Sequence, residues 1–310
     1  MVAAALLQPQ SGEGMTYTES FTSMALLQDG TFVVMGFMFS NLPFASGKGG
    51  CSLTVVRPGQ PDWRAQSKVD AEHWYAAPSP VPTLMVGDCR MTASSTGLQV
   101  DVELEGTTAL LHLDAPAKEV LPPSEPVRVE GRWYASSILV PFANAELTLA
   151  QPGKPVETLH GMGYADHSRS TALPPQLARG WIRFRGHSGR CGAVLQVRLP
   201  PGADSLGSGY LWQEGAAAPQ ALDNLKIGLP VADLPAARVQ LSWQIEGATW
   251  SLRAQKRLRR SEPVRDAGFL GRLASHWVGD ILNETFYATL EGPGSCGPVP
   301  GVLEVEHIKP

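Results

Sequence analysis

Charged residues are scarce in this chain: they make up 17% of its 310 residues, whereas 43% are hydrophobic. Such a composition excludes an intrinsically disordered protein and provides for a large apolar core. The formal net charge is only −4, so there is no global reason to expect a nucleic-acid partner. No run approaches the roughly 18 to 20 apolar residues that a membrane-spanning helix needs. These absences leave a folded protein outside the bilayer as the expected class.

The features of a signal peptide are also missing. The lead from Met1 to Pro9 has no basic region, and its apolar run is only about six residues long. We therefore expect a cytoplasmic protein. At most a peripheral membrane contact is expected, because one basic cluster fits either a solvated hairpin or a contact for anionic lipid. The cluster consists of Arg253, Lys256, Arg257, Arg259 and Arg260.

No signature of a metal or a cofactor is present. The seven histidines include no His-x-x-x-His pair, which is the spacing of a helical zinc site. No Gly-x-Gly-x-x-Gly or Walker sequence follows a strand pattern, and Gly-x-Ser-x-Gly is absent. We therefore expect neither a metal nor a cofactor. The sequence does not indicate an oligomeric state.

Cysteine is rare and dispersed. The four cysteines are Cys51, Cys89, Cys191 and Cys296, with no Cys-x-x-Cys among them. Zinc binding and a redox dithiol are therefore disfavoured, and scattered, reduced core thiols are the expected state. The even count also allows one or two disulfides.

The sequence does show a clear hydrophobic pattern, in which apolar residues recur with a period of two. In the ranges 98–104 and 239–245 apolar and polar residues alternate, as they do in strands with one buried face. Gly 32 and Pro 26 supply many turns, so we predict an all-β protein of short antiparallel strands. Evidence for helix is thin. The range 270–283 has Leu273, Trp277 and Ile281 at four-residue spacing, but a strand pair fits it nearly as well.

The length favours two domains of roughly 150 residues each. We expect residues 1–14 to form a disordered lead, residues 15–172 the first domain and residues 176–310 the second. The boundary is placed at the Leu173-Pro174-Pro175 loop because strand alternation restarts at Trp181.

Two imidazoles, a phenol and a carboxylate occur within eight residues in the segment 160–167, His-Gly-Met-Gly-Tyr-Ala-Asp-His. In an extended segment Tyr164 and Asp166 share one face, while Ala165 and His167 point the other way. Desolvation by apolar walls raises the pKa of an aspartic acid, so Asp166 could serve as a proton donor. Tyr164 or a histidine could orient water or steady developing charge. In the alternative interpretation Asp166 and His167 only satisfy turn amides, and the glycines only permit a tight backbone path.

The same segment resembles the Gly-x-Gly-Tyr-x-Asp-His signature of the AttH and carotenoid 1,2-hydratase (hydroxyneurosporene synthase) group. That group includes Svf1-like proteins and is related to lipocalin-like Diels–Alderases. Three blocks carry the resemblance in the right order: the range 19–41, the range 131–167 that ends in the motif, and the range 301–307. The resemblance implies two lipocalin-like antiparallel β-barrels packed side by side, with the motif near their junction and facing a ligand cavity.

Members of that group usually continue with Asn-Trp-Gly, whereas this chain continues Ser168-Arg169-Ser170. Arg169 could pair with Asp166, which would hold the carboxylate ionised and spoil it as an acid. It could instead bind a carboxylate or an enolate of the substrate.

The resemblance implies a cofactor-independent enzyme for an apolar, polyene or isoprenoid-like small molecule, in secondary metabolism. Its reaction would be hydration, isomerisation or cyclisation, including a pericyclase that only folds its substrate into a reactive pose. The expected catalytic residues are Asp166, Tyr164, His167 and His160. The expected substrate-binding residues are Arg169, His73, Trp74, Trp133, Trp181, Trp212 and Trp277, each tryptophan also being a plausible core residue. The alternatives are a non-catalytic carrier of hydrophobic ligands, of Svf1-like type, and a purely structural β-protein.

Overall fold

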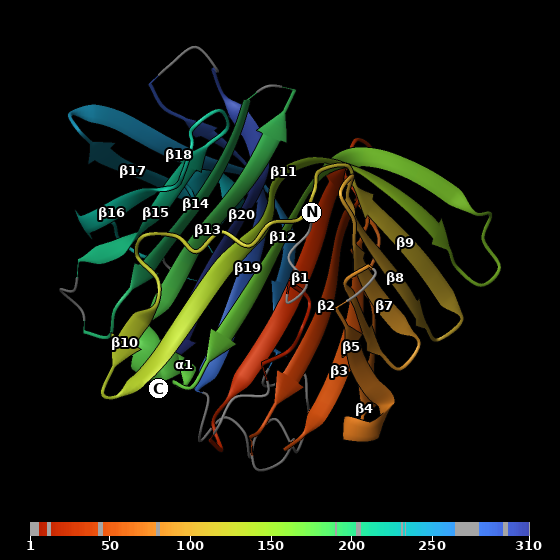
Figure 1. Cartoon of the computed structure of the whole chain (residues 1–310). Helices are drawn as coiled ribbons and strands as arrows, with labels where there is room; N and C mark the ends of the chain where they lie inside the picture. The colour runs from red at the N-terminus through yellow and green to blue at the C-terminus, as the bar shows by residue number, and fades with distance from the viewer. Residues whose placement is uncertain are drawn as a thin grey trace. The chain divides into compact units, whose positions relative to one another are not determined.

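The computed structural model describes most of the chain in detail (Figure 1). The described residues are 6–10, 14–42, 46–78, 81–189, 191–202, 206–230, 232, 234–263, 279–293 and 297–309. Within them, strands dominate, and the helical elements are the short α1 (Pro174–Leu177) and the 3₁₀ turns Ala71–His73 and Ala236–Arg238. The prediction of an all-β protein is confirmed.

The chain divides into two compact units. The first comprises residues 1–121 and 132–171, and the second comprises residues 122–131 and 172–310. Each unit is built on its own antiparallel sheet, which curves into a nearly closed barrel. The short strand β10 (Val127–Val129) lies in the segment that the second unit takes from the first half of the chain.

In the first unit the sheet order is β4-β3-β2-β1-β12-β11-β9-β8-β7-β6-β5. The strands are β1 (Thr18–Leu27), β2 (Phe32–Ser40), β3 (Lys48–Val56), β4 (Trp63–Val69), β5 (Trp74–Ala77), β6 (Thr83–Val86), β7 (Cys89–Ala93), β8 (Leu98–Leu104), β9 (Thr107–Leu113), β11 (Arg132–Ala150) and β12 (Glu157–Ser170). The chain's first strand therefore pairs with one that ends the unit, because β1 lies between β2 and β12. Alternate residues of these strands face a common apolar core.

A disulfide joins Cys51 on β3 to Cys89 on β7, with 6.4 Å between their Cα atoms. The two strands lie near opposite ends of the sheet order, and both side chains belong to the core of the first unit. The disulfide therefore ties the two sides of the curved sheet together. Cys191 is also disulfide-bonded, and Cys296 lies outside the described residues. The expectation of reduced thiols is wrong for Cys51, Cys89 and Cys191, because the fold brings distant cysteines into bonding range.

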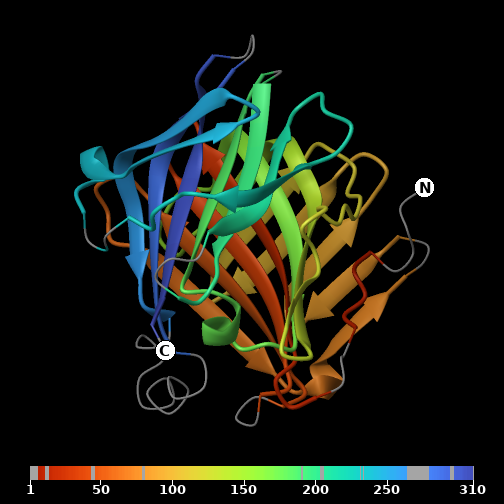
Figure 2. The same ribbon diagram turned by 90° about the vertical axis from the view of Figure 1, so that its left-hand side faces the viewer.

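In the second unit the sheet order is β16-β15-β14-β13-β20-β19-β18-β17. The strands are β13 (Gly180–Ser188), β14 (Cys191–Leu199), β15 (Gly207–Gln213), β16 (Gln220–Leu225), β17 (Gln240–Ile245), β18 (Ala248–Ser261), β19 (Asp280–Glu291) and β20 (Val299–Lys309). The end strands β16 and β17 contact each other, so this sheet comes close to closing on itself. Figure 2 shows these strands, coloured from green to blue, curving around their core.

The range 270–283, for which helix and strand were both considered, is described only at its end. Asp280–Asn283 form the start of β19, and residues 270–278 lie outside the described residues. None of the helices in the described ranges is long and apolar enough to cross a membrane.

The lead segment contributes to the first unit where it is described. Residues 6–10 belong to a stretch for which we expected disorder, yet Leu6 and Leu7 are buried in the first core. The backbone N–H of Gln10 donates a hydrogen bond to Glu19 Oε2 at 2.9 Å. The buried leucines and the hydrogen bond to Glu19 hold residues 6–10 against the first barrel.

Candidate functional site

The motif of the segment 160–167 lies in the middle of β12, between β1 and β11 (Figure 1). In the register with β1, Phe21 pairs with His167 and Thr22 pairs with Asp166. In the register with β11, Ser137 pairs with His167. The motif is therefore part of a central strand, with a neighbour on each side.

The two faces of β12 carry different chemistry. Ala165 belongs to the core of the first unit, and His167 stacks on the core residue Phe21 with 4.0 Å between ring centroids. Because side chains alternate along a strand, Tyr164 and Asp166 point to the opposite face. They are nevertheless buried, with relative exposures of 2% and 8%. Phenol and carboxyl thus share one face, and the imidazole of His167 lies on the other.

The strand β11 is irregular beside Asp166. Its pairing with β12 shifts between Ile138 and Val140 and again between Val140 and Ala143, opposite the residues from Asp166 to Gly163. Bulges of this kind bend a strand, interrupt its ladder of hydrogen bonds and are frequent next to active sites, where they redirect side chains. The pairing of β12 with β1 is regular throughout.

The glycines of the motif are required by close packing between strands. A Cβ at Gly161 would collide with the carbonyl oxygen of Leu26 and would lie 2.6 Å from Leu27 Cα. A Cβ at Gly163 would collide with the side chain of Leu113 and would lie 3.2 Å from Ala145 Cβ. The glycines therefore have a structural explanation that needs no catalytic role.

We expect Gly161→Ala to lower the free energy of unfolding by about 1–3 kcal/mol, because the added methyl group meets backbone that cannot yield without shifting β1. Gly228→Ala is a matched control, since nothing lies within 4 Å of a Cβ at that position. Urea denaturation of both variants measures the difference. Equal stabilities would show that β1 and β12 can separate enough to accept a side chain.

On the inner face, a network of polar side chains surrounds His167. The Nε2 atom of His167 lies 2.6 Å from Glu19 Oε1, and both side chains are buried, with exposures of 4% and 0%. The Nδ1 atom lies 3.7 Å from Glu119 Oε1, an ion-pair distance too long for a hydrogen bond. The hydroxyl of Tyr17 donates a hydrogen bond to Glu19 Oε2 at 2.7 Å. Ser137 donates one to Glu119 Oε1 at 2.8 Å.

These contacts shift the protonation equilibria. Burial lowers the pKa of His167, but the carboxylates of Glu119 and Glu19 outweigh it, so the net pKa is raised. The imidazolium of His167 in turn holds the pKa of Glu119 at about 2, against the opposing effect of burial. Burial and the hydrogen bond to Glu19 raise the pKa of Tyr17, which keeps the phenol protonated. The surroundings of His167 therefore favour its charged form, between the carboxyl groups of Glu19 and Glu119.

This network should make stability depend on pH. The folded pKa of His167 lies above its ordinary 6.5, so the contribution is complete below about pH 6.5 and is lost as pH rises through the folded value. The folded pKa of Glu119 lies below its ordinary 4.5, so that contribution is complete above about pH 4.5 and is lost as pH falls towards about 2. The network therefore stabilises the fold most between these limits.

Melting temperatures of the wild type and of His167→Gln, recorded from pH 5 to pH 9, measure this dependence. We expect the gap between the two proteins to narrow as pH rises from about 6.5 through the folded pKa of His167, because the unfolded chain releases its proton at a lower pH than the folded chain does. His160→Gln serves as the control, since the His160 side chain is 58% exposed. A gap that stays constant over this range would show that folding does not raise the pKa of His167.

Arg169 lies on the inner face with His167. Its Nη1 donates a hydrogen bond to Gln10 Oε1 at 2.6 Å, and its Nη2 lies 3.5 Å from Glu119 Oε1. Asp166 points to the outer face, so the partners of Arg169 in this structure come from the lead and from the carboxylate beside His167. Of its two expected roles, pairing with Asp166 is disfavoured by this geometry.

The other predicted site residues are dispersed. The exposed His160 lies 3.7 Å from Glu146 Oε2, and the exposed His73 lies 3.7 Å from Glu72 Oε1. Trp74 packs edge-on against Phe39 and borders the first core. The remaining positions are the half-buried Trp133 in the first unit, Trp181 and Trp212 in the second unit, and Trp277, which lies outside the described residues.

Sequence reasoning did not identify Tyr17, Glu19, Glu119 and Ser137, although they surround His167. The sequence does contain an indication of Glu19. It alternates with Tyr17, just before β1, and with Phe21 on β1, and all three side chains are buried. A carboxylate at an inward position of an apolar strand needs a buried partner.

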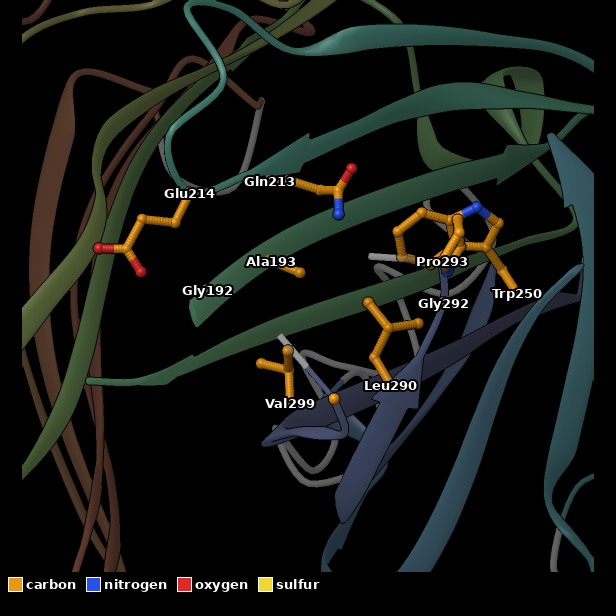
Figure 3. Close-up of a pocket in the computed structure, with 10 residues that line it drawn as sticks. Gly192, Ala193, Gln213, Glu214, Trp250, Leu290, Gly292, Pro293 and Val299 are labelled. Carbon is orange, nitrogen blue, oxygen red and sulfur yellow. The ribbon is translucent and has the colours of Figure 1, made fainter. Parts of the chain in front are cut away.

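A pocket that is partly open to solvent occurs in the second unit. Trp250, Leu290 and Val299 give it an apolar lining, and Figure 3 shows the side chain of Glu214 directed away from these residues. None of the predicted site residues that the structure describes lines this pocket. Within the described ranges, no group of three or more His, Cys, Asp and Glu side chains could hold a metal ion.

Solved structures share the fold of the whole chain. A candidate AttH from Nitrosomonas europaea matches with a TM-score of 0.63 and 14% identity, over 97% of each chain. CghA, solved with Sch210972, matches with a TM-score of 0.61 and 13% identity, over 95% of this chain and 88% of its own. Kievitone hydratase from Nectria haematococca matches with a TM-score of 0.58 and 14% identity, over 99% of this chain and 92% of its own. No family model and no curated protein matches the sequence. At these identities the likeness shows a common fold.

Proposed function

We propose that this protein is a cofactor-independent enzyme of the lyase or isomerase type. It hydrates, isomerises or cyclises an apolar, polyene or isoprenoid-like small molecule, and a role in natural-product biosynthesis fits that substrate. The observation that carries the proposal is the buried carboxyl of Asp166, which shares a face of β12 with Tyr164 beside the irregular part of β11.

The chemistry follows from one proton. Asp166 protonates a carbon–carbon double bond, the π electrons form the new C–H bond, and a carbocation remains on the neighbouring carbon. Addition of water and loss of its proton to the carboxylate complete a hydration. Loss of a different C–H proton to the carboxylate completes an isomerisation, and attack by a second double bond followed by proton loss to the carboxylate completes a cyclisation. Tyr164 can orient the water or stabilise the charge.

The structural comparisons support this class of reaction. One protein of the same fold is named a hydratase, and another was solved with Sch210972. In a pericyclase version the same face would only hold the substrate in its reactive conformation, and no proton would move.

The disulfides bear on the compartment in which the protein works. Disulfides persist in oxidising compartments and are rare in the cytosol. The bonded states of Cys51, Cys89 and Cys191 thus favour an oxidising compartment over the cytoplasm that the sequence suggested.

The proposal is tested by incubating the purified protein with a panel of acyclic isoprenoid polyenes in mild detergent. Mass spectrometry then separates the outcomes, because hydration adds the mass of one water while isomerisation and cyclisation leave the mass unchanged. Turnover should persist after dialysis against EDTA. A protein that retains a polyene through gel filtration and never converts it would be a carrier, and the enzymatic proposal would fail.

A further inference from the structure

Asp166 pairs with Thr22 on β1 and with Ile138 on β11, and it is the last residue of β12 before the β11 register becomes irregular. Towards β1, the register runs without interruption from Thr18 to Leu27. Towards β11, two shifts interrupt the register opposite the residues from Asp166 to Gly163. The regular ladder with β11 therefore ends at the proposed acid, so contacts of the neighbouring residue His167 can add to the restraint on β12 there.

The side chain that follows Asp166 supplies that restraint. His167 is bound to Glu19 on β1 at 2.6 Å, and its ring stacks on Phe21 with an interplanar angle of 5°. On the β11 side, Glu119 lies 3.7 Å from Nδ1 and accepts a hydrogen bond from Ser137, the β11 residue that pairs with His167. The imidazole thus binds the carboxyl of Glu19 on the β1 side and lies within ion-pair distance of Glu119 on the β11 side, next to the irregular part of β11.

Two hydrogen bonds other than the one with His167 orient the carboxyl group of Glu19. Its Oε2 accepts hydrogen bonds from the Tyr17 hydroxyl at 2.7 Å and from the Gln10 backbone at 2.9 Å. The other oxygen, Oε1, is left for His167, and the side chain has no exposure to solvent. A carboxylate held in this way has one orientation, and so does the imidazole that it binds.

We propose that Glu19 is a positioning residue for Asp166 and acts through His167, an inference that rests on the proposed function. Glu19 lies on the inner face and does not touch the substrate side of β12. By fixing the imidazole it fixes the backbone one residue away, and thereby the direction in which the carboxyl of Asp166 points. A catalytic group displaced by about 1 Å can lose about 10²-fold in rate, so this restraint affects catalysis directly.

The test uses Glu19→Gln in the full chain, which keeps the size of the side chain and removes its charge. The matched control is Glu146→Gln, because Glu146 also faces a histidine of β12, but at 55% exposure and far from Asp166 in the strand. Two kinds of measurement are made. Nuclear magnetic resonance follows the signals of the Asp166 backbone and carboxyl, and kinetics gives kcat and KM on the polyene that the wild type converts best.

We expect Glu19→Gln to shift the Asp166 signals and to lower kcat by about 10- to 100-fold, with KM changed by less than about threefold. The imidazole of His167 should titrate at lower pH, so that a new alkaline decline appears in the pH profile of kcat. Glu146→Gln should change none of these quantities. A merely structural role would reduce kcat only in proportion to the folded fraction and would leave the pH profile unchanged.

The outcomes separate this inference from the proposed function. If Asp166→Asn is inactive while Glu19→Gln keeps wild-type kcat and Asp166 signals, the function stands and the positioning role is overturned. If the wild type converts no polyene, the function fails, and the Asp166 signals of Glu19→Gln still decide whether Glu19 fixes that residue. Should Glu19→Gln fail to fold, Tyr17→Phe removes one of the two bonds that orient Glu19 and should give a smaller shift of the same signals. Unchanged signals in Tyr17→Phe would then overturn the inference.

Discussion

Asp166→Asn is expected to lower turnover by about 10²- to 10⁴-fold, the usual scale of general acid–base catalysis. The amide keeps the shape of the side chain and its ability to form hydrogen bonds, but it has no acidic proton to give to a double bond. Ligand binding and the melting temperature should change little. Turnover and melting temperature, measured on the same preparations, test this expectation.

The control for charge is Asp101→Asn, since Asp101 lies on β8 and its partner Arg90 is half exposed. If Asp166 is structural, the Asn variant should instead be less stable by about 1–3 kcal/mol, through an unmet buried donor or acceptor. Activity would then follow the folded fraction. A stable and fully active Asn variant would eliminate acid catalysis and would leave the pericyclase and carrier alternatives.

Removal of the Cys51–Cys89 disulfide should lower the free energy of unfolding by about 4 kcal/mol. The two cysteines are 38 residues apart, and the loss of chain entropy that a loop of this length imposes on the unfolded state gives that value. The effect should be large in this protein because the bond closes the first barrel between β3 and β7. Denaturation of the double variant Cys51→Ala with Cys89→Ala measures it.

Single Cys51→Ala is the matched control, because it separates the missing bond from the missing second sulfur atom. It should lose nearly the full amount, since one substitution already opens the loop. A loss below about 1 kcal/mol in both variants would mean that the packing of β3 against the far side of the sheet closes the barrel unaided.

The sequence contains enough information to predict the strands, because alternation is a local property. The range 98–104 forms β8 and the range 239–245 contains β17, as the period of two indicates. The opposite orientations of Asp166 and His167 follow from the same rule. These predictions need only the geometry of an extended chain and one buried face.

The sequence could not predict which distant residues lie close together in the folded protein. Glu19 and His167 are 148 residues apart, and the two cysteines of the first barrel lie on strands that are far apart in the sheet. Spacing along the chain says nothing about which strands become neighbours when a sheet closes. Leu6 and Leu7 show a related limit, since a short apolar run outside any strand gives no sign that a barrel will enclose it.

The pairing of β1 with β12 has a consequence for synthesis on the ribosome. The strands β1 to β4 leave the exit tunnel early and can pair with one another, but β1 must wait for residues 157–170 before its second edge is covered. Until then its unpaired N–H and C=O groups are a template for another chain, and the carboxylate of Glu19 has no imidazole beside it. The first barrel therefore closes late and folds slowly for its size, because most of the closing contacts join residues far apart in sequence. Aggregation during expression should accordingly depend on how quickly β12 follows β1, so slow translation between them should lower the yield of folded protein more than slow translation after Ser170.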